Sequence, residues 1–204
     1  MATRNTKEIL LRAAIDLFYR KGYAETSIRD IGAKADMSNS LVYHYFKNKE
    51  EVLFEIVSTA SQDLLQSLQE IEGRVDDPWE CLRQMLVVHL GVFGLQRKKE
   101  IKILVEELNF LRGKRREAVR QQQREIYDLY MNKLNLLAVT GRMNDVDLTV
   151  LNFSIFGIIN WFYRWYREGG RLSSQEVADN ILKILFDGIA RPEPFPALRG
   201  DIRE

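Results

Sequence analysis

The stretch that decides the fold is residues 26–49, TSIRDIGAKADMSNSLVYHYFKNK. A hydroxyl at Thr26 or Ser27 can cap a short helix, because it accepts a hydrogen bond from a free backbone N–H of the first turn. Residues 36–38, Asp-Met-Ser, then interrupt the apolar spacing, and Ser38 can cap a second helix. Two short helices joined by a three-residue turn can enter a DNA major groove. The sequence therefore predicts a helix-turn-helix.

Apolar side chains give each of these helices one inward face. Ile28 and Ile31 lie one turn apart in the first helix, as do Val42 and Phe46 in the second. The polar and basic side chains then point outward, where they can meet base edges or phosphates. The predicted DNA contacts are Thr26, Ser27, Arg29, Ser38, Asn39, Ser40, Tyr43, His44, Lys47 and Lys49.

Lys47 and Lys49 flank Asn48, whose side chain can cap a third helix. The helix dipole disfavours cations at a helix N-terminus. A bound phosphate would explain their placement, because it gains from both lysines and from the free N–H groups of the helix end. The alternative is that both lysines are simply solvated.

Residues 6–57 resemble the N-terminal DNA-binding domain of the TetR family of bacterial transcriptional repressors. The matching positions are Ala13, Leu17, Phe18, Gly22, Tyr23, Thr26, Ile28, Ile31, Ser38, Tyr43, Tyr45, Phe46, Lys49 and Glu50. Asp36 stands where the family commonly has glycine, and Asn39 and Ser40 replace a common Lys-Gly pair. The operator sequence is therefore expected to be particular to this chain. The resemblance implies a homodimer on near-palindromic double-stranded operator DNA and a small-molecule effector, with no cofactor.

The rest of the chain keeps a helical spacing of apolar residues. The pattern predicts a long helix that leaves the first domain, and further helices that glycines and Pro78 delimit. The expected helices span residues 48–72, 78–93, 98–110, 114–139, 145–168 and 174–189. The expected fold class is all-α with about nine helices. It comprises a three-helix DNA-binding domain at residues 1–50, an antiparallel helical ligand-binding and dimerisation domain at 51–191, and a tail at 192–204.

Residues 151–168, LNFSIFGIINWFYRWYRE, carry seven aromatic side chains on about five turns of one predicted helix. One face cannot hold them all, so two burials are expected, one in a ligand pocket and one in packing with the last helix and a symmetry mate. The alternative is that all seven serve core and interface packing. The predicted pocket residues are His89, Phe93, Leu108, Phe110, Arg112, Phe153, Phe156, Trp161, Arg164 and Trp165. The TetR resemblance implies a dimer formed by the last two helices, and the predicted interface residues are Phe162, Tyr166, Val177, Ile181, Ile184 and Leu185.

A basic cluster precedes this segment, formed by Arg112, Lys114, Arg115, Arg116 and Arg120. It is either a solvated face or the mouth of the aromatic pocket, which would then suit an amphipathic anion. Residues 160–170, NWFYRWYREGG, resemble the C-terminal domains of TetR-type repressors that sense acyl-CoA thioesters. That resemblance implies an acyl-CoA effector and control of fatty-acid or related catabolism. The open alternatives are a regulator of efflux or stress genes that responds to a hydrophobic drug-like compound, and an architectural DNA-binding protein without a ligand.

Composition excludes other classes of protein. Cys81 is the only cysteine, so no intrachain disulfide is possible, and no apolar run approaches the roughly 18 residues that span a bilayer. We expect a cytoplasmic protein without a membrane partner. His44 and His89 are the only histidines, and no metal-ligand cluster, nucleophile elbow or phosphate loop occurs. The sequence therefore predicts neither catalytic nor metal-binding residues, and not an enzyme.

Charge is unevenly distributed along the chain. The whole chain carries a formal net charge of +1, whereas residues 1–50 contain nine Lys or Arg and six Asp or Glu. A modestly basic first domain fits an electrostatic footprint for DNA, which a dimer would double.

Overall fold

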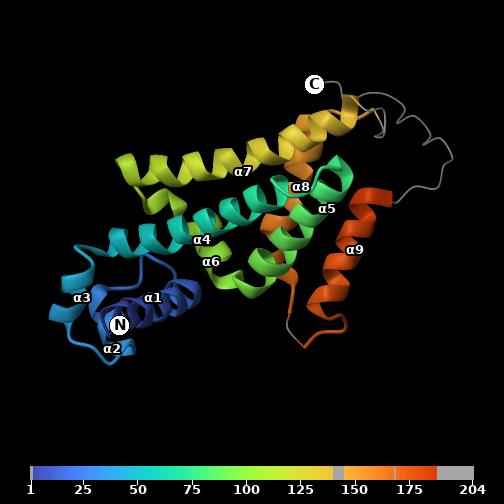
Figure 1. Ribbon diagram of the computed structural model, residues 1–204. Coiled ribbons are helices and arrows are strands. Elements are labelled where there is room, and N and C mark those ends of the chain that lie inside the picture. Colours follow the sequence, from blue (N-terminus) through green and yellow to red (C-terminus); the bar gives the residue numbers. More distant parts are fainter. Residues whose placement is uncertain (1, 140–144, 168, 188–204) are drawn as a thin grey trace, which may run out of the picture.

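The computed structural model describes residues 2–139, 145–167 and 169–187, and all regular structure in these ranges is helical. Figure 1 shows a small N-terminal group of helices at one end of the molecule and a larger bundle at the other, joined by α4. The elements are α1 (Ala2–Lys21), α2 (Ile28–Lys34), α3 (Asn39–Tyr45), α4 (Lys49–Glu72), α5 (Pro78–Val88), the π-helix η1 (His89–Gln96), α6 (Lys98–Glu107), the 3₁₀ turn η2 (Leu108–Phe110), α7 (Gly113–Val139), α8 (Leu148–Trp165) and α9 (Ser174–Asp187). The predicted all-α fold class is confirmed.

The expected caps set the helix-turn-helix. Ser27 caps α2 through a reciprocal pair, in which Asp30 N–H donates to its hydroxyl at 3.1 Å and its own N–H donates to the Asp30 carboxylate at 2.8 Å. Asp36 turns the chain with φ 54°, a left-handed conformation that Asp tolerates. Ser38 then caps α3, and Asn48 caps α4 by accepting Glu51 N–H at 2.9 Å. The cap positions predicted from sequence are confirmed, with Ser27 rather than Thr26 as the first.

Two apolar cores divide the molecule, but the chain does not divide between them at residue 50. The N-terminal core runs from Leu10 to Val57 and also contains Ile103 of α6, Leu111 of the link before α7, and Val119 of α7. The other core begins on the same α4 at Leu64. The N-terminal helices and their core are called the head below. The expected boundary between residues 50 and 51 falls inside the first turn of α4, so the head and the bundle share α4, α6 and α7.

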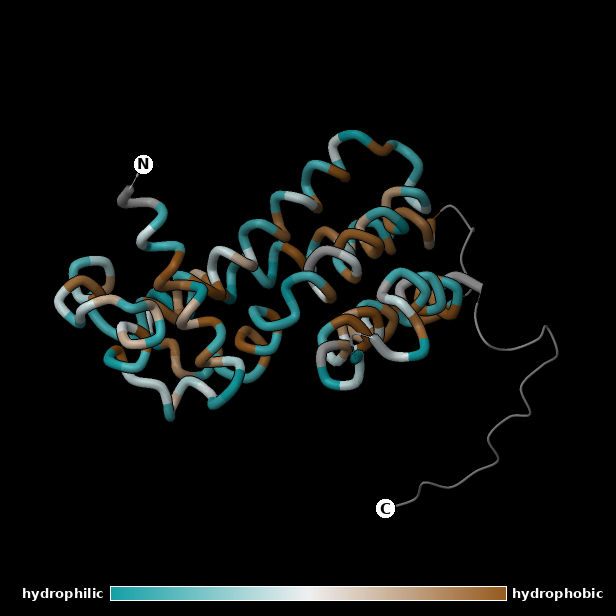
Figure 2. Tube along the Cα trace, turned by 90° about the horizontal axis from the view of Figure 1, so that it is seen from below, coloured by the Kyte–Doolittle hydropathy of each residue, from teal (hydrophilic) through white to brown (hydrophobic). Residues whose placement is uncertain are grey.

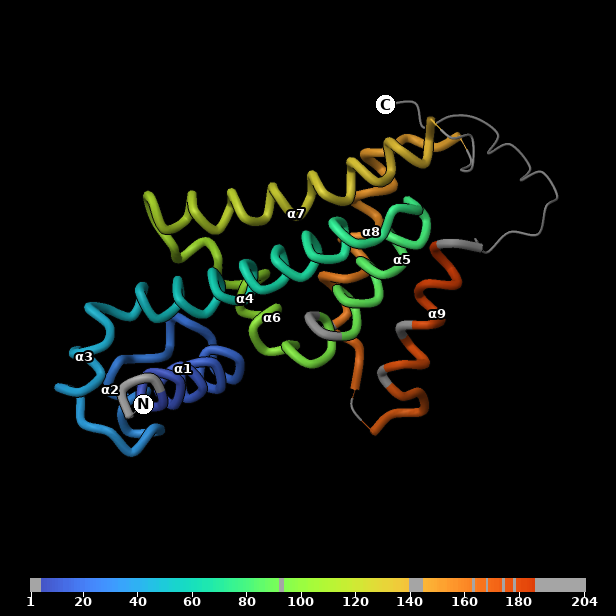
Figure 3. The backbone as a smooth tube through the Cα atoms, in the orientation of Figure 1, coloured from blue at the N-terminus to red at the C-terminus, as the bar shows by residue number. Residues whose placement is uncertain are grey.

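In the bundle, α4 packs along α7, and α8 contacts α6, η1 and α7. These helices lie beside one another in Figure 3, and the hydropathy colouring of Figure 2 places many apolar residues on the sides that face neighbouring helices. The expected helix 78–93 is shorter, because α5 gives way to the π-helix at His89. The last helix, α9, packs mainly on α5 and η1, where the sequence suggested packing on the aromatic helix. None of the described helices is apolar over enough of its length to span a membrane.

Candidate functional sites: a DNA-reading head and an internal pocket

The outer face of α3 presents a short polar surface. Asn39, Ser40, Tyr43 and His44 are all exposed, and Tyr43 exposes 58% of its surface although it is a large aromatic residue. Their neighbours Val42 and Phe46 are buried in the head and fix the helix. Exposed amide, hydroxyl and phenol groups on a helix that follows a tight turn can meet base edges and phosphates. The geometry of α3 thus suits groove reading.

Three of the predicted DNA contacts use their hydroxyl groups to hold the fold of the head, and one of them is Ser38, the cap of α3. Thr26 is 2% exposed, and its hydroxyl donates to the Gly22 carbonyl at 2.8 Å, which ties the loop after α1. Ser27 is exposed, but its hydroxyl is taken by the α2 cap. Arg29 is exposed on α2, where it remains available to a partner. A hydroxyl in a sequence pattern does not distinguish a cap from a contact, which explains these assignments.

Lys49 is also held inside the protein. Its Nζ donates to the carbonyls of Tyr23 at 2.7 Å and Ala24 at 3.1 Å, and it lies 4.2 Å from the centre of the Tyr23 ring. Burial lowers the pKa of this amine, since desolvation disfavours its charged form. The lysine thus fastens the start of α4 to the loop between α1 and α2. Lys47 is exposed and its side chain is the better candidate for a phosphate.

The two lysines should therefore respond differently to removal of their charge. We expect Lys49→Met to lower the free energy of unfolding by about 1–2 kcal/mol, because the part-buried Tyr23 carbonyl and the exposed Ala24 carbonyl lose a charged donor. We expect Lys47→Met to leave stability unchanged and to reduce the slope of log affinity against log salt by about one for each head. Chemical denaturation and DNA binding at several salt concentrations measure both effects. The assignment would be reversed by a Lys49→Met protein of normal stability with the shallower slope.

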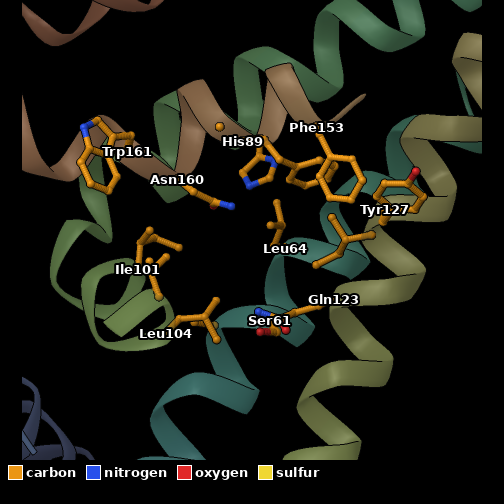
Figure 4. Close-up of a pocket in the computed structure, with 15 residues that line it drawn as sticks. Ser61, Leu64, His89, Ile101, Leu104, Gln123, Tyr127, Phe153, Asn160 and Trp161 are labelled. Carbon is orange, nitrogen blue, oxygen red and sulfur yellow. The ribbon is translucent and has the colours of Figure 1, made fainter. Parts of the chain in front are cut away.

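A pocket of about 430 Å³ lies in the bundle (Figure 4), lined by α4, α6, α7, α8 and the first residue of η1. Its lining is mostly apolar, and no residue described as lining it is charged. The apolar side chains are Ala60, Leu64, Ile101, Leu104, Val105, Ile126, Phe153, Phe156 and Trp161, and the polar ones are Ser61, His89, Gln123, Tyr127 and Asn160. A largely apolar pocket with a few polar groups is the usual form of a small-molecule site.

His89 is a buried polar group of this pocket, at 3% exposure. Its Nδ1 lies 3.1 Å from the hydroxyl of Tyr130, which is fully buried, and its ring meets the Phe156 ring edge-on at 5.9 Å. Burial lowers the pKa of His89 to about 3, because the charged imidazolium would lose its hydration. The side chain is therefore neutral at physiological pH and acts as a hydrogen-bonding group rather than a cation.

The cavity brings together only part of the predicted pocket. His89, Phe153, Phe156 and Trp161 line it. The other predicted positions lie elsewhere: Leu108, Phe110 and Arg112 at the head, Arg164 and Trp165 on the outer side of α8, and Phe93 outside the described side chains.

The turn between α6 and α7 runs back to the head rather than over the pocket, which accounts for three of these corrections. Phe110 packs on Tyr23 with ring centres 4.8 Å apart, and Arg112 N–H donates to the Glu50 carboxylate at 3.1 Å. In the basic cluster, Arg115 lies 3.8 Å from the same carboxylate. Arg115 of the cluster thus pairs with the start of α4, and none of the five basic residues lines the pocket, so the proposed arginine-rich pocket mouth is wrong.

Arg164 lies next to the pocket without lining it. Its guanidinium stacks on the Trp161 ring at 4.4 Å and pairs with Glu106 at 3.0 Å. Sequence reasoning missed Ser61, Gln123, Tyr127 and Asn160. Ser61 had a usable signal, because it sits on the apolar stripe of α4 between Val57 and Leu64.

The residues predicted for the dimer interface fall into a buried group and a more exposed group. Phe162, Val177 and Ile181 are buried in the core of the protomer, and Tyr166 stacks on Phe162 at 4.9 Å. Phe162 is thus a core residue, and its assignment to a surface is corrected. Leu185 is half-buried, and Ile184 is 50% exposed. Half or more of the surface of Val150 and Trp165 on α8 is also exposed.

Helix α6 connects the pocket with the head. Ile101, Leu104 and Val105 line the pocket, whereas other α6 side chains hold the head. Lys102 Nζ donates to the Tyr19 carbonyl at 2.9 Å, Lys99 pairs with Asp16, and the Glu107 carboxylate accepts Tyr23 N–H at 3.2 Å. A displacement of α6 on filling the pocket would therefore act directly on α1 and its loop. The described residues include no group of His, Cys, Asp and Glu that could hold a metal ion.

A reading helix on a capped turn, joined to a helical domain with an apolar pocket, defines a helix-turn-helix regulator of transcription rather than an enzyme. The description "Bacterial regulatory proteins, tetR family" matches residues 10–56, and "Tetracyclin repressor-like, C-terminal domain" matches residues 75–189. The chain belongs to the TetR family of transcriptional regulators.

Named relatives cover nearly the whole chain. The transcriptional repressor KstR2 of Rhodococcus jostii (strain RHA1) is 27% identical over 185 residues, which are 90% of each chain. The crystal structure of AibR in complex with isovaleryl coenzyme A and operator DNA is 28% identical, with a TM-score of 0.81 over 89% of this chain and 98% of that one. A TetR-family regulator from Bordetella parapertussis 12822 is also 28% identical, with a TM-score of 0.80 over 90% and 95% of the two chains.

Proposed function

We propose that the protein is a cytoplasmic repressor that binds a near-palindromic operator as a homodimer and is released by an acyl-CoA thioester. The observation that carries this proposal is the double role of α6, because this helix both lines the pocket and binds the head. The similar AibR structure contains both isovaleryl coenzyme A and operator DNA, which supports this class of effector. Two heads should read half-sites about 34–36 Å apart or a multiple of that distance.

The charge distribution divides the proposed ligand into two parts. The described pocket walls carry no charged side chain, so they suit the acyl group and would leave a nucleotide phosphate unpaired. Arg164, stacked on Trp161 beside the pocket, is the cation best placed for the polar part of the ligand. Binding there would compete with its ion pair to Glu106 on α6. The acyl group would thus fill the slot while the coenzyme remains outside.

For the dimer, the exposed apolar side chains Val150, Trp165 and Ile184 are the proposed contacts. They replace Phe162, Val177 and Ile181, which the protomer itself buries. Tyr166 and Leu185 are half-buried and would lie at the edge of such a contact.

The test begins with selection of genomic DNA fragments that the purified protein binds, which supplies the operator. Fluorescence anisotropy of that operator is then measured with a series of acyl-CoA thioesters. We expect the effective thioesters to lower operator affinity and the operator to weaken thioester binding by the same factor, because the two effects are linked. A thioester that binds equally well to the free and the operator-bound protein would contradict the mechanism.

One observation favours a second candidate effector. A pocket whose described walls lack any basic side chain also suits a neutral, hydrophobic drug-like compound, as expected of a regulator of efflux or stress genes. This alternative would be selected if neutral hydrophobic compounds without coenzyme A release the protein from the operator and thioesters do not. An architectural protein without a ligand would show no thermal stabilisation with either class.

A further inference from the structure

Ser61 has a buried hydroxyl with no hydrogen-bond partner among the described residues. It lies on α4 at the wall of the pocket, at 2% exposure, and its Oγ contacts no donor or acceptor of the described residues. Helical serines commonly donate to the carbonyl four residues earlier, as Ser67 does to Asp63 and Ser154 does to Val150. A buried polar atom left unpaired costs free energy and calls for an explanation. A ligand atom in the pocket would supply one.

His89 offers a second polar group to the same space. The Tyr130 hydroxyl is fully buried, and its one hydrogen bond among the described residues is to His89 Nδ1 at 3.1 Å. A buried phenol needs an acceptor for its proton, so Nδ1 accepts and the ring proton is on Nε2. The imidazole, which Figure 4 shows in the pocket, then presents an N–H donor with no protein partner among the described residues.

Both groups are neutral, and they lie in an otherwise apolar slot. Burial keeps His89 uncharged, since its pKa falls to about 3, and no described residue that lines the cavity carries a charge. A carboxylate or phosphate in this slot would be buried without a counter-ion. Neutral oxygens can accept from these donors without that cost. A purely hydrocarbon ligand would leave both of them unpaired.

We propose that the part of the effector inside the cavity carries a neutral oxygen function, a ketone or a hydroxyl on an apolar skeleton, bound by His89 Nε2–H and the Ser61 hydroxyl. The proposal deepens the acyl-CoA function and rests on it for the coenzyme part of the ligand. It selects oxidised or hydroxylated acyl groups over plain saturated ones, because buried polar groups in a site discriminate strongly against a ligand that lacks their partner.

The test compares six-carbon thioesters that differ only in this oxygen. The probes are hexanoyl-CoA and its analogues with a ketone or hydroxyl at carbon 3, 4 or 5, and the same acyl groups as N-acetylcysteamine thioesters, which lack the nucleotide. Isothermal titration gives the affinity of each for the full-length protein. We expect at least one oxygenated acyl group to bind about fivefold or more tightly than hexanoyl in both series, the size of one well-formed hydrogen bond.

Ser61→Ala and Ser67→Ala are the matched variants, since both change a serine on α4. Ser61→Ala should reduce the oxygen preference while leaving the ligand-free melting temperature unchanged or higher, because it removes an unpaired buried hydroxyl. Ser67→Ala should lower stability slightly and keep the preference. A purely structural Ser61 would not combine a weaker ligand with an equally stable protein.

The outcomes separate this proposal from the acyl-CoA function. Equal or tighter binding of hexanoyl in both series, or no binding of any probe, overturns the oxygen proposal. Oxygen preference in the N-acetylcysteamine series without operator release by any CoA thioester supports the oxygen proposal and contradicts the acyl-CoA function. If hexanoyl-CoA releases the operator as effectively as every oxygenated thioester, the result supports the acyl-CoA function and contradicts the oxygen proposal.

Discussion

Replacing Gly32 by alanine should weaken operator binding about tenfold or more while leaving most of the protein folded. A Cβ atom at this position would lie 2.9 Å from the Met37 carbonyl and 3.2 Å from the Asn39 side chain. The Gly32 carbonyl also accepts the Met37 N–H at 2.9 Å, so the backbone of α2 touches the turn with no space between them. The added carbon must push the turn and the start of α3 outward.

We expect operator affinity to fall about tenfold or more, since displacement of α3 loses at least one base contact worth about 1–3 kcal/mol. The free energy of unfolding should fall by about 1–3 kcal/mol from overpacking. Gly157→Ala is the control, because nothing lies within 4 Å of its added carbon. That variant should gain up to about 1 kcal/mol from helix propensity and keep operator affinity. Unchanged operator binding by Gly32→Ala would show that α3 is not the reading helix.

Phe162→Ala should be the most destabilising single change in the bundle. The side chain is 1% exposed, stacks on Tyr166 and meets Trp165 edge-on at 5.0 Å. Truncation of a buried phenylalanine leaves a cavity that its neighbours fill only in part, at a cost of about 3–5 kcal/mol. Urea denaturation of the ligand-free protein measures the loss.

Trp165→Ala is the matched control on the same helix, since 51% of its surface is already in water. It should cost less than half as much at a fixed protein concentration. If Trp165 lies in the proposed dimer contact, its loss should instead make the melting temperature more dependent on protein concentration. A larger loss for Trp165 than for Phe162 at high dilution would mean that the core assignment of Phe162 is wrong.

The sequence predicted the helices and the turn well because their signals are local. Caps at Ser27, Ser38 and Asn48 need only the next three residues, and apolar spacing along α4 needs only that helix. The end of α5 was mispredicted because a π-helix begins at His89, and periodicity alone cannot distinguish the two forms.

The sites were predicted less completely, because they depend on what lies opposite each side chain. Lys49 was a predicted DNA contact because it is positively charged, but the sequence does not show that the carbonyls of Tyr23 and Ala24 bind this charge. Arg115 of the basic cluster likewise meets Glu50 and Glu51, over sixty residues away in the chain. The pocket draws its walls from five elements, so the aromatic segment identified only the part contributed by α8.

The sharing of α6 and α7 between the two cores limits how this regulator can be recombined. A head cut after Val57 would lose Ile103, Leu111 and Val119, and with them one side of its core. A chimaera that joins this head to another sensor should therefore fold only if residues 99–119 are transplanted with it. Operator specificity and effector specificity are thus coupled in one structure. A regulator that combines a new operator with a new effector requires changes where α6 and α7 contact the head, rather than exchange of whole domains.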